Sequence, residues 1–292
     1  MSDGGVIVLD KPAGVSSAAA LHPVKRAFPK RTRVGHAGTL DPFATGVLLA
    51  LVGDATRLSS LAMGLPKTYR ATVRFGTATD TLDPEGTVVA QADPGPGAPV
   101  GLAEALAVFL GEREQLPPAY SALKVGGRRA YALARAGREP TLAPRRVVVH
   151  AIELLDARWP DAEIEVTCGA GFYVRAMARD LGDALGLPAH LSALRRTAIG
   201  PFRAGDGCAP EEATPQHVRP MLEVVRAAGV PEVAVGLEEA RRFCAGSAVP
   251  AAAADGPVAV TTGEGVLVGL GDACGGTARP RTVFAAARRA LA

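Results

Sequence analysis

The densest group of residues that could carry out chemistry lies in segment 35–46, GHAGTLDPFATG. An imidazole, His36, and a carboxylate, Asp41, stand close together on one short loop whose glycines allow the backbone to approach a ligand closely. The loop is expected to open a helix at Pro42, and the N-terminus of a helix favours negative charge. The segment has no Gly-Lys-Ser/Thr, so it is not a P-loop for nucleotide phosphates.

A purely structural interpretation of the same loop competes with the chemical one. An Asp-Pro pair such as Asp41-Pro42 is a common helix start, with Asp41 as the N-cap. A single histidine in a loop is also more often structural than reactive. The residue types and spacing alone therefore leave both interpretations open.

The elements that must position this loop form a mixed pattern of strands and helices. Strands and helices are interspersed without a regular βαβ repeat, which predicts an α+β fold. The serines at 16 and 17 are expected to cap the start of one helix, and the glycine at 137 to end another. The expected strands are 5–9, 68–76, a strand after the turn at 79–86, 145–156 and 162–168, and the expected helices are 16–27, 42–51, 101–110, 128–137 and 173–186.

The last third of the chain changes in composition at about residues 205–230. Beyond this linker the apolar runs are short, VAVTT, GVLVGLG and RPRTVF, and they predict a small β-rich module. The expected division is a large domain over residues 1–228 and a small one over residues 229–292.

Basic residues are concentrated in two segments, although the net charge is only +3. Residues 21–36 carry five Lys or Arg and no acid, and residues 120–150 carry seven against one Glu. Such segments suit a surface that faces a polyanion, but ordinary solvated faces would look the same.

Other features exclude several classes of protein. The four cysteines form no CxxC pair and the five histidines are scattered, so we expect no metal site and reduced thiols. The N-terminus does not resemble a signal peptide. The most apolar run, residues 44–52, is too short to span a bilayer. We therefore expect a soluble, cytoplasmic protein.

The loop sequence GHAGTLDPFATGVL resembles the catalytic motif of the TruB family of tRNA pseudouridine synthases, roughly GHTGTLDPLATGVL. The resemblance covers about residues 5–205, and residues 230–290 are similar in outline to a PUA RNA-binding module. Ala37 and Phe172 depart from the family pattern, which has Thr at both positions. Five further motifs follow in the family's order: DKPAG at 10–14, KTYRA at 67–71 with TDTLD at 79–83, PAYSALK at 118–124, GFYVR at 171–175 with DLG at 180–182, and AHL and LRRT within 189–197.

The resemblance implies a pseudouridine synthase fold, with a mainly antiparallel sheet and helices, followed by a small PUA-like domain. It implies isomerisation of the uridine in the TΨC loop of tRNA, position 55, without a cofactor or a metal. Asp41 is implied as the catalytic carboxylate. Because desolvation alone would neutralise Asp41, the neighbouring cation implied by the family pattern, Arg175, is needed to keep it charged.

Other implied roles concern the RNA. Everting a uridine costs on the order of a few kcal/mol, and stacking on an aromatic ring returns about 1–3 kcal/mol. Tyr69 is implied as the stacking ring, which can also move a proton, and Tyr173 as a second pocket tyrosine. His36 is expected to contact the everted nucleotide or its phosphate, and Lys11 to steady the loop or the RNA backbone. The basic segment is expected to bind phosphates through Lys124, Arg128 and Arg129.

The expected partner is the TΨC arm of tRNA, bound by a monomer with no protein partner. One alternative is a non-catalytic RNA-binding or tRNA-folding protein, which would not need Asp41, Tyr69 and Arg175 together. A second is a nucleosidase or glycoside hydrolase, for which Asp80 and Asp83 could supply the paired carboxylates. A third is a synthase that acts on another uridine or another RNA.

Overall fold

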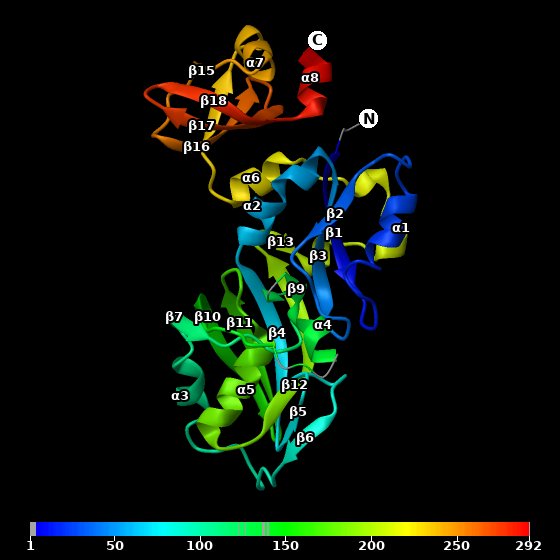
Figure 1. Ribbon diagram of the computed structural model, residues 1–292, viewed down its shortest axis with the longest axis vertical. Helices are drawn as coiled ribbons and strands as arrows, with labels where there is room; N and C mark the ends of the chain where they lie inside the picture. The colour runs from blue at the N-terminus through cyan, green and yellow to red at the C-terminus, as the bar shows by residue number, and fades with distance from the viewer. Residues whose placement is uncertain (1–3, 122, 126, 136–137, 139, 292) are drawn as a thin grey trace.

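The computed structural model describes residues 4–121, 123–125, 127–135, 138 and 140–291. Its main feature is a nine-stranded sheet that runs along the long axis of the molecule, with a smaller five-stranded sheet at the C-terminal end (Figure 1). In the described part of the large sheet, neighbouring strands pair antiparallel except β12 and β3. The mixed, mainly antiparallel α+β fold expected from the sequence is therefore confirmed.

The edge of the large sheet near the N-terminus is buried on both faces. β1 (Gly4–Lys11) pairs with β3 (Thr45–Gly53), and every residue from 46 to 52 is buried. Val47, Leu49 and Leu51 pack into one apolar cluster, while Leu48 and Ala50 pack into another on the opposite face. Both faces of β3 therefore contribute to the core.

The helix expected over residues 42–51 is wrong, because this segment forms β3. A short apolar run that is buried on both faces has no periodicity to separate a strand from a buried helix. The segment forms a strand because, in a strand, its alternate side chains reach the two cores on either side of the sheet. Asp41 consequently lies in the turn that leads into a strand, and it does not cap a helix.

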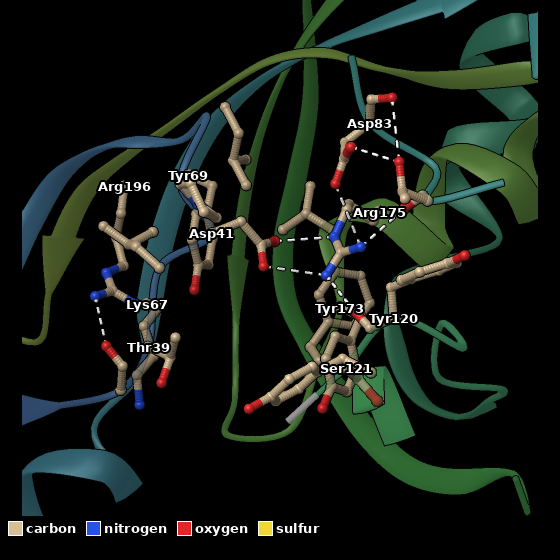
Figure 2. A pocket seen from close by; sticks show the side chains of 18 of the residues that line it. Thr39, Asp41, Lys67, Tyr69, Asp83, Tyr120, Ser121, Tyr173, Arg175 and Arg196 are labelled. Carbon is tan, nitrogen blue, oxygen red and sulfur yellow. Dashed lines mark hydrogen bonds and ion pairs between the residues drawn. The ribbon is translucent and has the colours of Figure 1, made fainter. Parts of the chain in front are cut away.

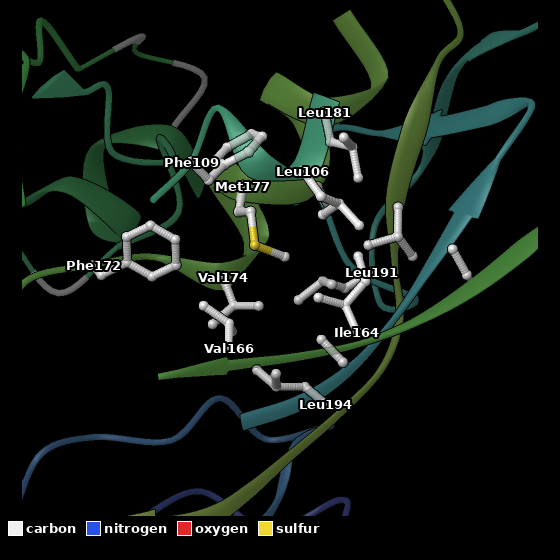
Figure 3. Packing of buried hydrophobic residues seen from close by; sticks show 14 of the residues in the cluster. Leu106, Phe109, Ile164, Val166, Phe172, Val174, Met177, Leu181, Leu191 and Leu194 are labelled. Carbon is white, nitrogen blue, oxygen red and sulfur yellow. The ribbon is translucent and has the colours of Figure 1, made fainter. Parts of the chain in front are cut away.

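The middle of the sheet carries the core beneath the site. β4 (Lys67–Phe75) lies between β11 (Asp161–Cys168) and β12 (Ala189–Ile199). Side chains of β11 alternate between half-buried and buried, and Ile164 and Val166 pack under α5 (Val174–Leu185) (Figure 3). β12 was not among the expected strands, although it lies in the interior of the sheet between β3 and β4.

The other expected elements between residues 5 and 186 are mostly present, with shifted ends. The expected strands are found as β1, β4, β6 (Val88–Gln91), β10 (Arg145–Arg158) and β11, and the expected helices as α1 (Leu21–Arg26), α3 (Leu102–Ala107) and α5. The basic helix expected over 128–137 is partly wrong: β9 (Arg128–Arg129) pairs with β8 (Lys124–Val125), and α4 covers only Ala130–Arg135. Residues 136 and 137 lie outside the described residues.

Shorter elements complete the large unit. They are β2 (Val34–Ala37), η1 (Asp54–Leu58), α2 (Ser59–Gly64), β5 (Thr77–Thr79), β7 (Gly111–Gln115), β13 (Phe202–Arg203), η2 (Ala204–Asp206), η3 (Pro210–Glu212), η4 (Pro215–His217) and α6 (Leu222–Ala227). None of the helices in the described part of the chain is long and apolar enough to cross a membrane.

The C-terminal module is built around the five-stranded sheet, ordered β14-β16-β17-β18-β15. The strands are β14 (Glu232–Val235), β15 (Val249–Pro250), β16 (Gly256–Thr262), β17 (Leu267–Cys274) and β18 (Thr277–Val283), and the helices are α7 (Leu237–Cys244) and α8 (Ala285–Leu291). Its Leu267, Leu270 and Phe284 belong to the same apolar cluster as residues of β1, β3 and α6. The module therefore packs against the large unit through a shared core. The division at residue 228 stays a prediction.

Phe284 offers a test of this shared core, because its side chain is fully buried where the two units meet. Phe284→Ala is expected to lower the free energy of unfolding by about 3–5 kcal/mol, through lost burial and the cavity left behind. Urea denaturation measures this change. Val266→Ala, at an exposed position of the same module, serves as the control and is expected to change stability by about 0.5 kcal/mol or less. Equal effects of the two substitutions would contradict the shared core.

Candidate active site

A cavity of about 930 Å³ opens beside the middle of the large sheet (Figure 2). Its walls come from segments that are far apart in the sequence and that meet only after folding. They are the loop at 38–42, the start of β4, the turn at 80–87, residues 120–121, the segment 169–175, and β12. Asp41, Tyr69, Tyr173 and Arg175 all line this cavity.

Asp41 and Arg175 form a bidentate ion pair in the cavity. Arg175 Nε lies 2.9 Å from Asp41 Oδ2, and Nη2 donates to Oδ1 at 3.1 Å (Figure 2). The Asp41 side chain is 34% exposed, whereas that of Arg175 is only 6% exposed. The carboxylate is therefore accessible from the cavity, while the guanidinium supports it from behind.

The guanidinium of Arg175 is fixed by three further contacts. Nη1 donates to the Thr81 carbonyl and Nη2 to the Tyr120 carbonyl, both at 2.8 Å. Nη1 also lies 3.4 Å from Oδ2 of Asp83, a carboxylate whose side chain is 6% exposed. Because the guanidinium is planar and always charged, these partners set both its position and its orientation.

The start of α5 brings Arg175 to this place. Tyr173 precedes the helix with an extended backbone, and Arg175 is the second helical residue. The buried side-chain amide of Gln115, at the end of β7, donates to the Tyr173 carbonyl at 3.1 Å and accepts from its N–H at 2.9 Å. This pair of hydrogen bonds fixes the entry to the helix, and with it the direction of the arginine.

The charge of Asp41 results from opposing effects. Burial raises the pKa of its carboxyl above the ordinary value of 3.8, and the negative charge of Asp83 acts in the same direction. The Arg175 guanidinium opposes both by lowering this pKa. A bidentate ion pair needs the ionised carboxylate, so Arg175 stabilises the charge that desolvation disfavours.

The loop that carries Asp41 is held by two buried polar side chains. The ammonium of Lys11 donates to the carbonyls of Pro12, Val15 and Pro42 at 2.8, 2.7 and 3.2 Å. The Ser17 hydroxyl bonds to both the N–H and the carbonyl of Leu40. Lys11 is 0% exposed, and burial lowers its pKa to about 8. Of its two expected roles, this placement favours steadying the loop over contact with the RNA backbone.

The two tyrosines present rings to the cavity. Tyr69 projects from β4, opposite Arg196 of β12, whose guanidinium carbon lies 6.0 Å from the centre of the Tyr69 ring. Burial raises the pKa of Tyr69 and of Tyr173, so both phenols are neutral at physiological pH. Neutral rings on the walls of a cavity suit a planar base.

His36 lies on β2, and it is not among the residues that line the cavity. Its Nδ1 is buried and makes no hydrogen bond within the described part of the chain, and burial lowers its pKa. The contact with an everted nucleotide that the sequence suggests for His36 stays a prediction.

Lys124, Arg128 and Arg129 lie on β8 and β9, between Ser121 and Tyr131 of the cavity wall. The described part of the structure includes their backbone but not their side chains, so their phosphate contacts also stay a prediction.

The sequence did not indicate the roles that four polar residues have in the site. Asp83, assigned to a turn, is the second carboxylate beside Arg175.

Arg196 is 1% exposed and donates from Nε to the Val47 carbonyl and from Nη2 to the Gly38 carbonyl, so it attaches the Asp41 loop to the sheet. Lys67 donates to the Met63 and Leu65 carbonyls, and burial lowers its pKa to about 8. Gln115 is the fourth. Asp83, Lys67 and Arg196 lie within the family-like motifs, which was the available signal.

In the described part of the chain, no group of three or more His, Cys, Asp and Glu is placed to hold a metal ion. The four cysteines are free thiols.

Comparison with known proteins identifies the class. Residues 25–174 match the TruB family pseudouridylate synthase N-terminal domain, and residues 175–218 match the tRNA pseudouridylate synthase B C-terminal domain. The chain is 43% identical over 287 residues to tRNA pseudouridine synthase B of Thiobacillus denitrificans, covering 96% of both chains. It is 42% identical over 293 residues to the protein of that name from Ruegeria pomeroyi, covering 96% of this chain and 95% of the relative.

Among solved structures, a crystal structure of a Cbf5-Nop10-Gar1 complex contains a similar chain. The TM-score is 0.73 at 26% sequence identity, over 97% of this chain and 85% of that one. The fold and the pocket thus define a pseudouridine synthase. More specifically, the chain belongs to the TruB family, and the resemblance seen in its motifs is confirmed.

Asp83 provides a test of the site geometry, because it supports Arg175 from the side away from Asp41. Asp83→Asn is expected to lower the single-turnover rate of pseudouridine formation, the family reaction, by about 10–100-fold at saturating enzyme. The reason is that the Arg175 guanidinium would lose a partner that fixes its position. Affinity for RNA, measured by filter binding, is expected to change by less than about twofold. Asp183→Asn, an exposed position on the same helix as Arg175, is the control. A full rate in the Asp83 variant would contradict its role.

Proposed function

We propose that this chain is an enzyme that converts the uridine of the TΨC loop of tRNA, position 55, to pseudouridine. The observation that carries the proposal is the Asp41 carboxylate, accessible from the cavity yet bound by the buried Arg175. Membership in the TruB family and relatives named tRNA pseudouridine synthase B support tRNA as the substrate.

The reaction breaks the bond between N1 of uracil and C1′ of the ribose, and then joins C1′ to C5. The detached base must be held and turned while the C5 proton leaves and N1 gains a proton. Asp41 can attack as a nucleophile, or it can assist departure of uracil through a glycal-like intermediate. Neither route transfers electrons or a phosphoryl group, so the side chains of the cavity suffice.

The cavity suits a base taken out of its stack. Eversion costs on the order of a few kcal/mol, and stacking on Tyr69 would return about 1–3 kcal/mol. Tyr173 and Leu194 add further apolar wall. The substrate base would thus rest on rings on one side while its ribose faces Asp41.

The basic segment at residues 120–150 would form part of the surface that binds the RNA. Tyr120, Ser121 and Tyr131 line the cavity, and the described residues of β8 and β9 lie between them in the chain. Lys124, Arg128 and Arg129 lie in this stretch, where they would contact phosphates without reading sequence. The module over residues 229–292 would add a PUA-like RNA-binding surface.

Two alternative functions fit the geometry less well. A hydrolase would need Asp80 and Asp83 as a pair of acids beside the substrate. Asp83 is instead buried against Arg175, and Asp80, which lines the cavity, accepts hydrogen bonds from the Thr87 N–H and the Tyr120 hydroxyl. A non-catalytic RNA-binding protein would not need a partly exposed carboxylate held by a buried arginine. The proposal includes a cytoplasmic monomer without a protein partner, whereas the similar Cbf5 chain was solved in a complex with Nop10 and Gar1.

Replacement of the Asp41 carboxylate tests the proposed reaction. Asp41→Asn is expected to abolish pseudouridine formation on an unmodified tRNA transcript, because the neutral amide can neither attack nor stabilise positive charge at C1′. Binding of the tRNA should remain within about threefold of the wild type, since phosphate contacts supply most of the affinity. Carbodiimide-adduct mapping by primer extension measures the product and its position.

Asp156→Asn, on the exposed part of β10, is the matched control and should retain full activity. Turnover by the Asp41 variant would overturn the catalytic role. A wild-type product outside the TΨC loop would keep the reaction and overturn the substrate. Release of free uracil would indicate a hydrolase.

A further inference from the structure

A second cavity, of about 400 Å³, lies where the C-terminal module meets the large unit. One wall is Arg57 of η1, and the other walls come from β18, α8 and the turn at Gly246. It is separate from the catalytic cavity, with which it shares no lining residue.

The walls of this second cavity carry three guanidinium groups, those of Arg57, Arg281 and Arg288. Among the described residues they form one salt bridge, from Arg281 to Asp272 at 3.5 Å. Both of its side chains are more than half exposed, so this pair is weak. The cavity therefore has an excess of positive charge that an anion could neutralise.

The walls are held in place before any ligand arrives. Arg57 Nη1 donates to the Val283 carbonyl at 2.6 Å, and the Ala285 N–H donates to the buried Asp54 carboxylate at 2.5 Å. Phe284, between these two contacts, packs in the core shared by the two units. The backbone of the walls and Arg57 are therefore fixed, so that binding would have to order only the exposed Arg281 and Arg288 side chains.

We propose that this cavity binds a backbone phosphate of the RNA substrate, at a point distant from the uridine that is modified. Guanidinium groups match phosphate oxygens in both charge and geometry. The described lining contains no aromatic ring on which a base could stack, so a sequence-independent phosphate contact fits better than a bound nucleotide.

The position of the cavity indicates which part of the RNA reaches it. β18 and α8 lie at the C-terminal end of the long axis, whereas the elements of the catalytic cavity, β4 and α4, lie around the middle (Figure 1). An RNA that occupies both places must extend well beyond the target loop. The inference rests on the proposed function for the identity of this RNA, which is the helical part of tRNA beyond the TΨC loop.

Two RNA substrates separate this contact from catalysis: a full tRNA transcript and a short stem-loop that carries only the TΨC arm. Arg281→Gln and Arg288→Gln are the informative variants, because within the described part of the chain neither side chain makes a hydrogen bond that holds the fold. Each is expected to weaken binding of the full tRNA by about threefold to tenfold and to lower the salt slope by about 1.

Binding and single-turnover modification of the short stem-loop should stay unchanged in both variants. Arg158→Gln, which removes the same charge from an 87% exposed side chain, is the matched control and should leave both substrates unaffected. An equal loss on the two RNAs, or no loss on full tRNA, would overturn the site. Failure of the wild type to modify the stem-loop and the tRNA would instead overturn the proposed function.

Discussion

The ion pair between Asp41 and Arg175 is the central interaction of the site, and the surrounding elements are arranged to support it. A carboxylate that must react inside a cavity loses much of its hydration, and its neutral form is then favoured. Arg175 supplies the compensating charge, but a buried guanidinium also needs partners. Carbonyls from the 81 and 120 segments and the carboxylate of Asp83 provide them. The charge of the Asp41 carboxylate is thus maintained by three separate parts of the chain: the start of α5, the turn that holds Thr81 and Asp83, and the segment at Tyr120.

The large sheet brings these parts together. β3 is buried on both faces, so the loop before it cannot shift without disturbing two cores. Lys11 and Arg196 then attach this loop to the sheet through backbone carbonyls. β3 and β12 lie so close at Gly46 that a Cβ there would be 2.1 Å from the Arg196 carbonyl oxygen. The φ of Gly46 is +102°, which also favours glycine. Rigid support of this kind is what a reacting carboxylate requires.

Local patterns in the sequence were enough to predict most of the strands and the motif residues, but not their long-range partners. Alternation identified β4 and β11, and the family-like motifs pointed to Asp41, Tyr69 and Arg175, which the fold brings to one cavity. β3 was mistaken for a helix because burial on both faces removes the alternation. Asp83 was read as part of a turn, since nothing in its neighbours shows that an arginine 92 residues later lies beside it. Such contacts depend on the tertiary fold and leave no local signal.

Titration of the Asp41 carboxyl carbon by ¹³C NMR would show whether the Arg175 guanidinium keeps this carboxylate charged, with the resonance assigned through its absence in an Asp41→Asn variant. The carboxylate is expected to be ionised at neutral pH in the wild type, because Arg175 opposes the effect of burial. In an Arg175→Gln variant the midpoint should move to higher pH, because the strongest group that lowers the pKa of Asp41 is lost and only the weaker effect of Lys11 still opposes burial and Asp83. An unchanged midpoint would mean that Asp41 holds its charge without the guanidinium, and Arg175 would then not have the role assigned to it.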